Sequence, residues 1–181
     1  MRHHPRSPRR PSRPLLLLTA LLAPFTALAT DALATAEQAV AAPACPLLID
    51  ATSAPKALAE LQGQVVYLDF WASWCGPCRQ SFPFMNTLQT ELGAKGLAVV
   101  AVNLDEEAAD AAKFLAAHPA QFQVAGGDNT ACASAFKVEA MPSSYLIDRA
   151  GRVRLVHHGF RAGDTATLRA RIEALLAEPA S

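Results

Sequence analysis

The chain has 181 residues, of which 51% are hydrophobic and 18% are charged. This composition excludes a collagen-like, coiled-coil or wholly disordered chain and indicates one ordinary globular domain. The formal net charge is zero, but the five arginines before residue 14 lie in a stretch without any acidic residue. Without residues 1–29 the chain has 11 basic and 16 acidic side chains, a net charge of −5. Because phosphate binding needs a basic surface, this balance argues against a nucleic-acid partner.

The first 29 residues have the pattern of a secretory signal peptide. A basic head is followed by an apolar run from Leu15 to Ala29, and this run ends in the small-x-small sequence Ala27-Leu28-Ala29. The run contains Pro24 and is shorter than the roughly 20 residues that span a membrane. We therefore predict a signal peptide over residues 1–29, with an uncleaved membrane anchor as the alternative.

Residues 30–44 are rich in alanine and weakly patterned, which is typical of a flexible leader. We expect the folded domain to cover residues 45–181. The signal peptide predicts a periplasmic, extracytoplasmic location, where disulfides form and persist. The four cysteines of the chain are therefore expected to form disulfides, and their roles are the main question.

Apolar patterns predict one α/β domain with a mixed central sheet. Buried strands over 65–71 and 97–102 flank a helix whose apolar stripe ends at Gly93, and two parallel strands joined in this way make a right-handed βαβ unit. Further along the chain we predict a helix over 106–117, a loop over 126–129, a short helix over 130–136, an antiparallel hairpin of strands 144–147 and 153–156, and a C-terminal helix through Leu168 and Leu176 capped by Asp164 or Thr165. This order predicts helices on both faces of the sheet.

The sequence Trp74-Cys75-Gly76-Pro77-Cys78 lies where the first buried strand ends and the next helix begins. Unpaired backbone N–H groups and the helix dipole stabilise a thiolate at a helix N-terminus. Cys75 is therefore the candidate attacking thiolate, and Cys78, one turn into the helix, is the candidate resolving thiol. A zinc site or an inert bridge is the alternative, but zinc needs four ligands and the sequence contains no second pair of this kind.

The stretch from Leu68 to Arg79 (LDFWASWCGPCR) resembles the active-site region of the thioredoxin superfamily. Together with the signal peptide, Phe82-Pro83, residues 141–148 (MPSSYLID) and Gly159, it makes the chain similar to the secreted TlpA/ResA-like thiol-disulfide oxidoreductases. The resemblance covers residues 46–177 and implies a thioredoxin fold.

The resemblance also implies roles for individual residues. Pro142 matches the cis-proline that faces the cysteine pair and presents backbone to an extended substrate. Asp69 matches the buried acid that assists proton transfer at the second cysteine, and burial in an apolar strand is expected to raise the pKa of such a carboxyl. The implied substrate-binding residues are Trp74, Gly76, Pro77, Met141 and Pro142, and no cofactor or metal ion is implied.

Two positions depart from the pattern of many secreted members. Those members carry a glutamate three residues after the second cysteine and an uncharged residue at the position of Asp69, whereas this chain has Ser81 and Asp69. The acid thus stands at the location that thioredoxins use. We expect proton transfer to follow thioredoxin, while the choice of partner stays open.

Cys45 and Cys132 are the remaining cysteines. An even number of cysteines in an oxidising compartment favours a structural disulfide between them, which would tie the leader to the short helix before Met141. A second redox couple, free thiols and intermolecular pairing are the alternatives.

The predicted function is reduction of protein disulfides outside the cytoplasm by the Cys75–Cys78 dithiol/disulfide couple. The resemblance implies a membrane thiol electron donor, and it implies apocytochrome c or copper-site assembly proteins as recipients. An uncleaved N-terminal segment would tether the domain to the membrane. The alternatives are an oxidase that donates its disulfide and a copper-binding assembly factor that uses Cys75, Cys78 and a histidine.

Overall fold

The structure of the protein is a computed structural model that describes residues 39–48 and 56–179. The predicted signal peptide and the first part of the predicted leader lie outside the described residues. In chain order the described elements are β1 (Val40–Ala41), β2 (Pro46–Leu47), β3 (Lys56–Ala57), the 3-10 helix η1 (Leu58–Leu61), β4 (Val65–Trp71), α1 (Gly76–Leu92), η2 (Gly93–Lys95), β5 (Leu97–Asn103), α2 (Ala108–Ala117), β6 (Gln123–Ala125), α3 (Thr130–Ala135), β7 (Ser143–Ile147), β8 (Arg152–His158), η3 (Ala162–Asp164) and α4 (Thr165–Ala177).

A six-stranded mixed sheet forms the centre of the domain, in the order β1-β8-β7-β4-β5-β6. The strands β4, β5 and β6 are parallel, and β7 joins β4 antiparallel on the other side. Every residue of β4 and β5 is buried. Near-continuous apolar runs of this kind suit strands that are covered on both faces, and so the predicted mixed sheet is confirmed.

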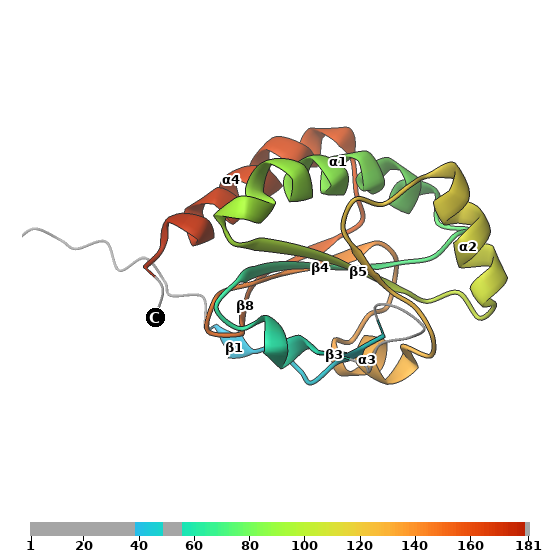
Figure 1. Ribbon diagram of the computed structural model, residues 1–181, viewed down its shortest axis with the longest axis horizontal. Helices are drawn as coiled ribbons and strands as arrows, with labels where there is room; N and C mark the ends of the chain where they lie inside the picture. The colour runs from blue at the N-terminus through green and yellow to red at the C-terminus, as the bar shows by residue number, and fades with distance from the viewer. Residues whose placement is uncertain (1–38, 49–55, 180–181) are drawn as a thin grey trace, which may run out of the picture. The chain divides into compact units, whose positions relative to one another are not determined.

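The two faces of the sheet carry different layers (Figure 1). Alternate residues of a strand point to opposite faces, so Tyr67 and Trp71 pack into one apolar cluster and Leu68 and Phe70 into the other. The first cluster, which we call the catalytic face, includes side chains of α1, α2 and α4. The second, which we call the back face, includes side chains of η1 and α3. Helices therefore cover both faces, as the sequence predicted.

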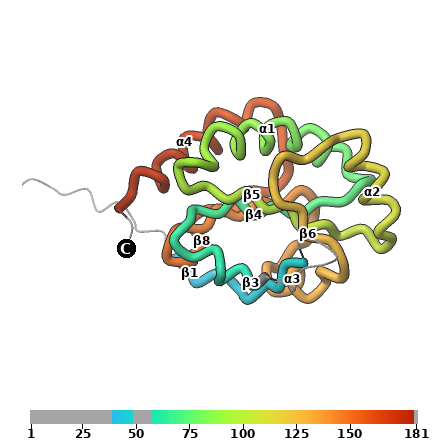
Figure 2. The backbone as a smooth tube through the Cα atoms, in the orientation of Figure 1, coloured from blue at the N-terminus to red at the C-terminus, as the bar shows by residue number. Residues whose placement is uncertain are grey.

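The edge of the sheet differs from the expectation. Val40 and Ala41, which the sequence placed in a flexible leader, form β1 and pair antiparallel with Val153 and Arg152 of β8 (Figure 2). Without β1, the free edge of β8 would present unpaired N–H and C=O groups, which bind even a short segment of weak pattern. The three-residue strand β6 was also not predicted, because it is too short to show an alternating pattern.

Asp164 is the N-cap residue of the C-terminal helix α4, as predicted, but the expected capping hydrogen bond is not formed. Neither Asp164 nor Thr165 caps α4 with its side chain. The Asp164 carboxylate accepts a hydrogen bond of 2.8 Å from the backbone N–H of Arg161, and the Thr165 hydroxyl donates one of 3.0 Å to the carbonyl of Ala162. The 3-10 turn η3 precedes α4 and uses both side chains.

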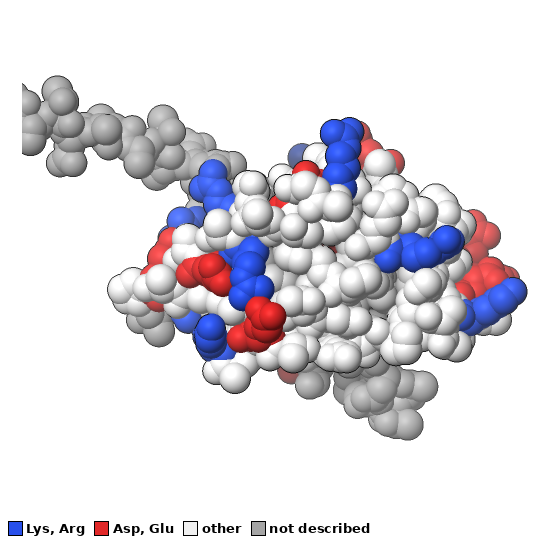
Figure 3. Space-filling model, turned by 90° about the horizontal axis from the view of Figure 1, so that it is seen from above, with Lys and Arg blue, Asp and Glu red and all other residues white. Residues whose placement is uncertain are grey.

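The surface over the catalytic face carries scattered charges of both signs, separated by uncharged side chains (Figure 3). Within residues 39–48 and 56–179, none of the helices combines the length and the apolar character that crossing a membrane requires.

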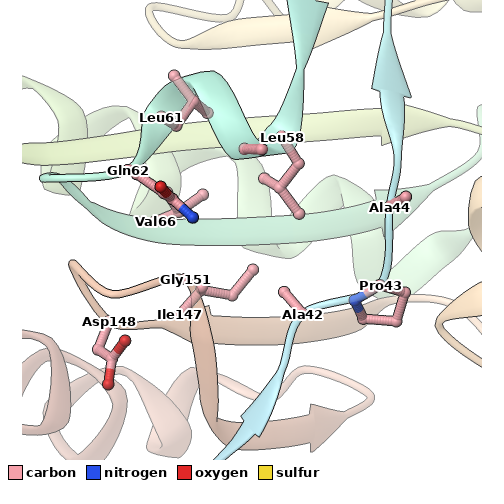
Figure 4. A pocket seen from close by; sticks show the side chains of 11 residues that line it. Ala42, Pro43, Ala44, Leu58, Leu61, Gln62, Val66, Ile147, Asp148 and Gly151 are labelled. Atoms are coloured by element: carbon pink, nitrogen blue, oxygen red, sulfur yellow. The ribbon is translucent and has the colours of Figure 1, made fainter.

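The back face contains a disulfide and a pocket. Cys45 and Cys132 are both buried and are joined by a disulfide that connects positions 87 residues apart. Beside the leader, a pocket of about 200 Å³ is lined mainly by aliphatic side chains, among them Leu58, Leu61 and Ile147 (Figure 4).

We predict that replacing Cys45 and Cys132 together by alanine lowers the free energy of unfolding by about 4 to 5 kcal/mol, because the disulfide restricts a long loop of the unfolded chain. Urea unfolding of the oxidised protein measures this loss. Replacing Cys75 and Cys78 by alanine is the matched control, for which the same loop-entropy relation gives about 2 kcal/mol, since these cysteines are only 3 residues apart. Equal losses for the two pairs would contradict the chain-entropy explanation.

Candidate active site

Cys75 and Cys78 are placed by the junction of β4 and α1. Cys75 is the N-cap of α1, and its Sγ accepts a hydrogen bond of 3.2 Å from the backbone N–H of Cys78. The two cysteines are joined by a disulfide. Cys75 is 4% exposed and Cys78 is fully buried, whereas the side chain next to them, Trp74, is 72% exposed. Gly76 and Pro77 are exposed as well, so the surface beside Cys75 is open, whereas Cys78 lies fully inside.

The turn before the cysteines is anchored by a residue that the sequence reasoning missed. The Asp105 carboxylate accepts hydrogen bonds from the backbone N–H of Ser73 at 3.0 Å and from its hydroxyl at 2.9 Å. The Asn103 side chain donates a further bond of 2.8 Å to the same carboxylate. The signal was available, because Asp105 follows a strand parallel to β4 and the carboxyl ends of parallel strands meet at one edge of the sheet.

Met141 and Pro142 lie at the end of the sheet that carries the cysteines. The peptide bond between them is cis, and the carbonyl of Pro142 accepts a hydrogen bond of 2.8 Å from the backbone N–H of Gly159. Met141 packs against the apolar cluster that contains Cys75 and Cys78. The structure thus brings the predicted substrate-binding residues to the same side of the molecule as the redox pair.

Aromatic rings pack together in the apolar cluster that contains the cysteines. Trp71 is fully buried, and its ring centroid lies 4.9 Å from that of Phe82 and 4.9 Å from that of Phe114. Phe82 and Phe114 are also in contact, with centroids 5.0 Å apart. Edge-to-face and tilted packing of this kind fixes the rings within the apolar cluster that also contains Cys75 and Cys78.

Asp69 is fully buried on the catalytic face, between the side chains of Tyr67 and Trp71 along β4. Its Oδ1 accepts a hydrogen bond of 2.6 Å from the Ser144 hydroxyl, while Oδ2 has no hydrogen-bond partner among the described residues. Burial raises the pKa of Asp69 to about 7, and the hydrogen bond from Ser144 offsets part of this rise. The carboxyl can therefore take up and release a proton near neutral pH.

Cys45 and Cys132 lie apart from this site. Their disulfide belongs to the back face, whereas Cys75 and Cys78 belong to the catalytic face. The buried sheet separates the two disulfides.

The described residues provide a pocket beside the site but no cluster of metal ligands. Within the part of the chain that the structure describes, no group of three histidine, cysteine or acidic side chains is arranged to hold a metal ion. A pocket of about 900 Å³ lies at the carboxyl ends of β5 and β6, and Asp105 is one of its lining residues. It therefore adjoins the turn that carries Ser73 and Cys75.

The chain matches a family model, several curated protein sequences and several solved structures. The Redoxin family model matches residues 36–172. Curated relatives include the thiol-disulfide oxidoreductase ResA of Bacillus cereus (strain ZK / E33L), 34% identical over 96 residues, and that of Bacillus subtilis (strain 168), 31% identical over 96 residues. The aligned segment covers 53% of this chain and 56% and 54% of the two relatives, so the chain spans about half the length of the curated relatives it matches.

Solved structures give broader coverage. A proposed thiol:disulfide interchange protein DsbE from Chlorobium tepidum is 49% identical, with a TM-score of 0.72 and coverage of 77% of this chain and 97% of the other. The thioredoxin domain of a thiol-disulfide oxidoreductase from Bacteroides vulgatus is 20% identical, with a TM-score of 0.66 and coverage of 74% and 96%. These likenesses confirm the predicted thioredoxin fold.

We predict that Asp69 makes the protein less stable as the pH rises from about 4 to about 7. An acid with a raised pKa in the folded state binds more protons there than in the unfolded chain, so stability falls through this window. Three pH units at about 1.4 kcal/mol each correspond to a loss of up to about 4 kcal/mol, which Asp69→Asn should abolish. Urea unfolding of the oxidised protein at several pH values measures the free energy of unfolding of the wild type and of Asp69→Asn.

Asp128→Asn is the control for this experiment. The Asp128 carboxylate accepts a hydrogen bond from the backbone N–H of Thr130, which lowers the pKa of this exposed acid. Its contribution therefore has the opposite sign and is lost as the pH falls. An unchanged pH slope in Asp69→Asn would contradict the raised pKa.

Proposed function

Because the chain belongs to the Redoxin family, as a TlpA/ResA-like member of the thioredoxin superfamily, we propose that it is a thiol-disulfide oxidoreductase acting on protein disulfides. The observation that carries this proposal is the Cys75–Cys78 disulfide at the N-terminus of α1, with Cys75 as the N-cap. The helix N-terminus stabilises the Cys75 thiolate once the disulfide is reduced. The exposed Trp74, Gly76 and Pro77 give a protein partner access to this sulfur.

The reaction transfers two electrons from the reduced cysteine pair to a substrate disulfide. The Cys75 thiolate attacks one substrate sulfur, forms a mixed disulfide and releases the other substrate sulfur as a thiolate. Cys78 then loses its proton and attacks the Sγ of Cys75, which forms the Cys75–Cys78 disulfide and releases the second substrate thiolate. Both substrate thiolates take protons from the medium, so one substrate disulfide becomes two thiols.

Asp69 is the base for the second step. Cys78 is fully buried and has no direct exchange with water. The Asp69 carboxyl lies on the same face of β4 as the residues that pack around Cys78, and its Oδ2 is free of hydrogen bonds among the described residues. A base with a pKa of about 7 in this position takes the Cys78 proton at neutral pH.

The favoured direction is reduction outside the cytoplasm, at the periplasmic side of the membrane. The basic and apolar pattern of residues 1–29 supports export, either as a cleaved signal peptide or as a tether. A membrane thiol donor then supplies the electrons, and the recipients are apocytochrome c or copper-site assembly proteins, as the resemblance to the secreted reductases implies. The catalytic pair itself needs no cofactor for thiol-disulfide exchange.

We predict that Cys75→Ser abolishes reduction of insulin disulfides, because the attacking thiolate is lost. Cys78→Ser should instead accumulate a mixed disulfide with the substrate, since Cys75 can still attack but nothing resolves the product. Turbidity of reduced insulin and non-reducing gel electrophoresis measure the two effects. The Cys45→Ala/Cys132→Ala protein, where it remains folded, is the control and should keep its activity. Full activity of Cys75→Ser would exclude this mechanism.

The reduction potential of the Cys75–Cys78 couple tests the direction. We expect a value of about −250 mV or lower, which is typical of reductants that need an external electron supply. Equilibration with glutathione or dithiothreitol buffers, followed by thiol labelling, measures it. A value near about −120 mV would mark a disulfide donor and would make the oxidase alternative correct.

A further inference from the structure

A row of polar side chains crosses the sheet from Asp69 to the molecular surface on the catalytic face. Asp69 of β4 is the register partner of Ser144 of β7, and Ser144 is the register partner of His157 of β8. Register partners point to the same face, with Cβ atoms about 4.5–5.5 Å apart. The exposure increases along the row, because Asp69 and Ser144 are 0% and 3% exposed and the His157 side chain is 26% exposed.

Hydrogen bonds give the buried part of this row a direction. The Ser144 hydroxyl has a single proton and donates it to Oδ1 of Asp69 at 2.6 Å. The Tyr67 hydroxyl donates in turn to Oγ of Ser144 at 2.9 Å. Burial and the Asp69 carboxylate raise the pKa of Tyr67, so this phenol stays protonated and acts as a donor. The chain of donors therefore ends at the ionised Asp69 carboxylate.

The outer end of the row is a histidine paired with an acid. Nε2 of His157 lies 3.3 Å from Oδ2 of Asp164, and both side chains are partly exposed. An imidazole exchanges protons with water near neutral pH, and a neighbouring carboxylate orients its ring. His157 is thus the member of the row that reaches solvent.

The reaction proposed above requires such a connection. Each turnover transfers the Cys78 proton to Asp69, and this proton has to leave before the next substrate is resolved. Trp71, Phe82 and Phe114 pack against one another and form an apolar barrier in the cluster that contains the cysteines. A route across the sheet avoids this apolar barrier.

We propose that Ser144 and His157 are positioning residues that form the proton route between Asp69 and solvent, and that the hydrogen bond from the Tyr67 hydroxyl holds Ser144 in place. The proposal rests on the proposed oxidoreductase function, in which Asp69 accepts the Cys78 proton. After that transfer, the protonated Asp69 passes a proton to Ser144, whose own proton moves outward to His157 and then to water. Charge and atoms balance, because one proton enters the row at Asp69 and one leaves at His157.

The titratable groups around Asp69 come from four elements. Tyr67 is on β4 itself, and Cys78 of α1 belongs to the apolar cluster on the same face. His157 lies two strands away on β8, and Asp164 follows on η3. Apolar packing on the same face includes Ala101 of β5, which is the register partner of Asp69, and Ile172 of α4. Among the described members of this set, His157 and Asp164 are therefore the ionisable side chains that are partly exposed.

The direct test is the rate at which the Asp69 carboxyl exchanges its proton with D2O. Time-resolved infrared spectroscopy of the oxidised protein at pH 5 follows the carboxyl band, which Asp69→Asn identifies by its disappearance. We expect Ser144→Ala to slow this exchange at least about ten-fold and Ser144→Thr, which keeps the hydroxyl, to preserve it. His157→Ala should also slow the exchange, and added imidazole should restore it. His158→Ala, the neighbour on the opposite face of β8, is the matched control and should have no effect.

Turnover provides a second readout. Since the bond from Ser144 lowers the pKa of Asp69, Ser144→Ala should move the midpoint of the pH profile of insulin reduction to higher pH, and Ser144→Thr should return it. Carboxyl exchange that is equally fast in the wild type, Ser144→Ala and His157→Ala would overturn the proton route. Because this measurement needs no enzymatic activity, it separates failure of the route from failure of the oxidoreductase function, which would appear as an active Cys75→Ser protein.

Discussion

The position of the α1 N-terminus relative to β4 is the constraint on which the rest of the structure depends. Cys75 needs the unpaired N–H groups of the first helical turn, and only three residues separate it from the last residue of β4. The position of the first turn of α1 therefore depends on how rigidly β4 is fixed. Complete burial of β4 fixes the strand, and the bonds from Ser73 to Asp105 fix the turn between strand and helix.

The same burial creates the problem of moving protons. A strand that is covered on both faces gives the cysteines a rigid support from which water is excluded. The proton acceptor that serves Cys78 then has to lie in the same water-free region. Asp69 occupies this position at a cost in stability at neutral pH, because its charge is removed from water. The Ser144 hydroxyl, which accepts a hydrogen bond from Tyr67, reduces this cost without opening the core, since a hydroxyl group needs little space.

Local patterns explain which parts of this arrangement could be predicted from the sequence. The apolar run of β4, the stripe of α1 and the hairpin turn at Gly151 each show their structure within a short window, and the Cys75–Cys78 pair stands out at the strand-to-helix junction. The edge strand β1 and the hydroxyl of Ser144 depend on pairing between distant segments. Such pairing carries no periodic signal, so these features required the structure.

The two disulfides differ in how much conformational entropy the chain gains when each is reduced. This difference favours Cys75–Cys78 as the reversible couple. Reduction of Cys45–Cys132 opens a link between positions 87 residues apart and frees the leader from α3, so reclosure must bring two distant segments together. Reduction of Cys75–Cys78 opens a ring of positions 3 residues apart, in which the first turn of α1 keeps both sulfurs close. A couple that cycles at every turnover needs this small reorganisation, and a link that stabilises the fold needs the long loop. The sheet keeps the two roles on opposite faces, so thiol exchange at the catalytic face leaves the back-face link undisturbed.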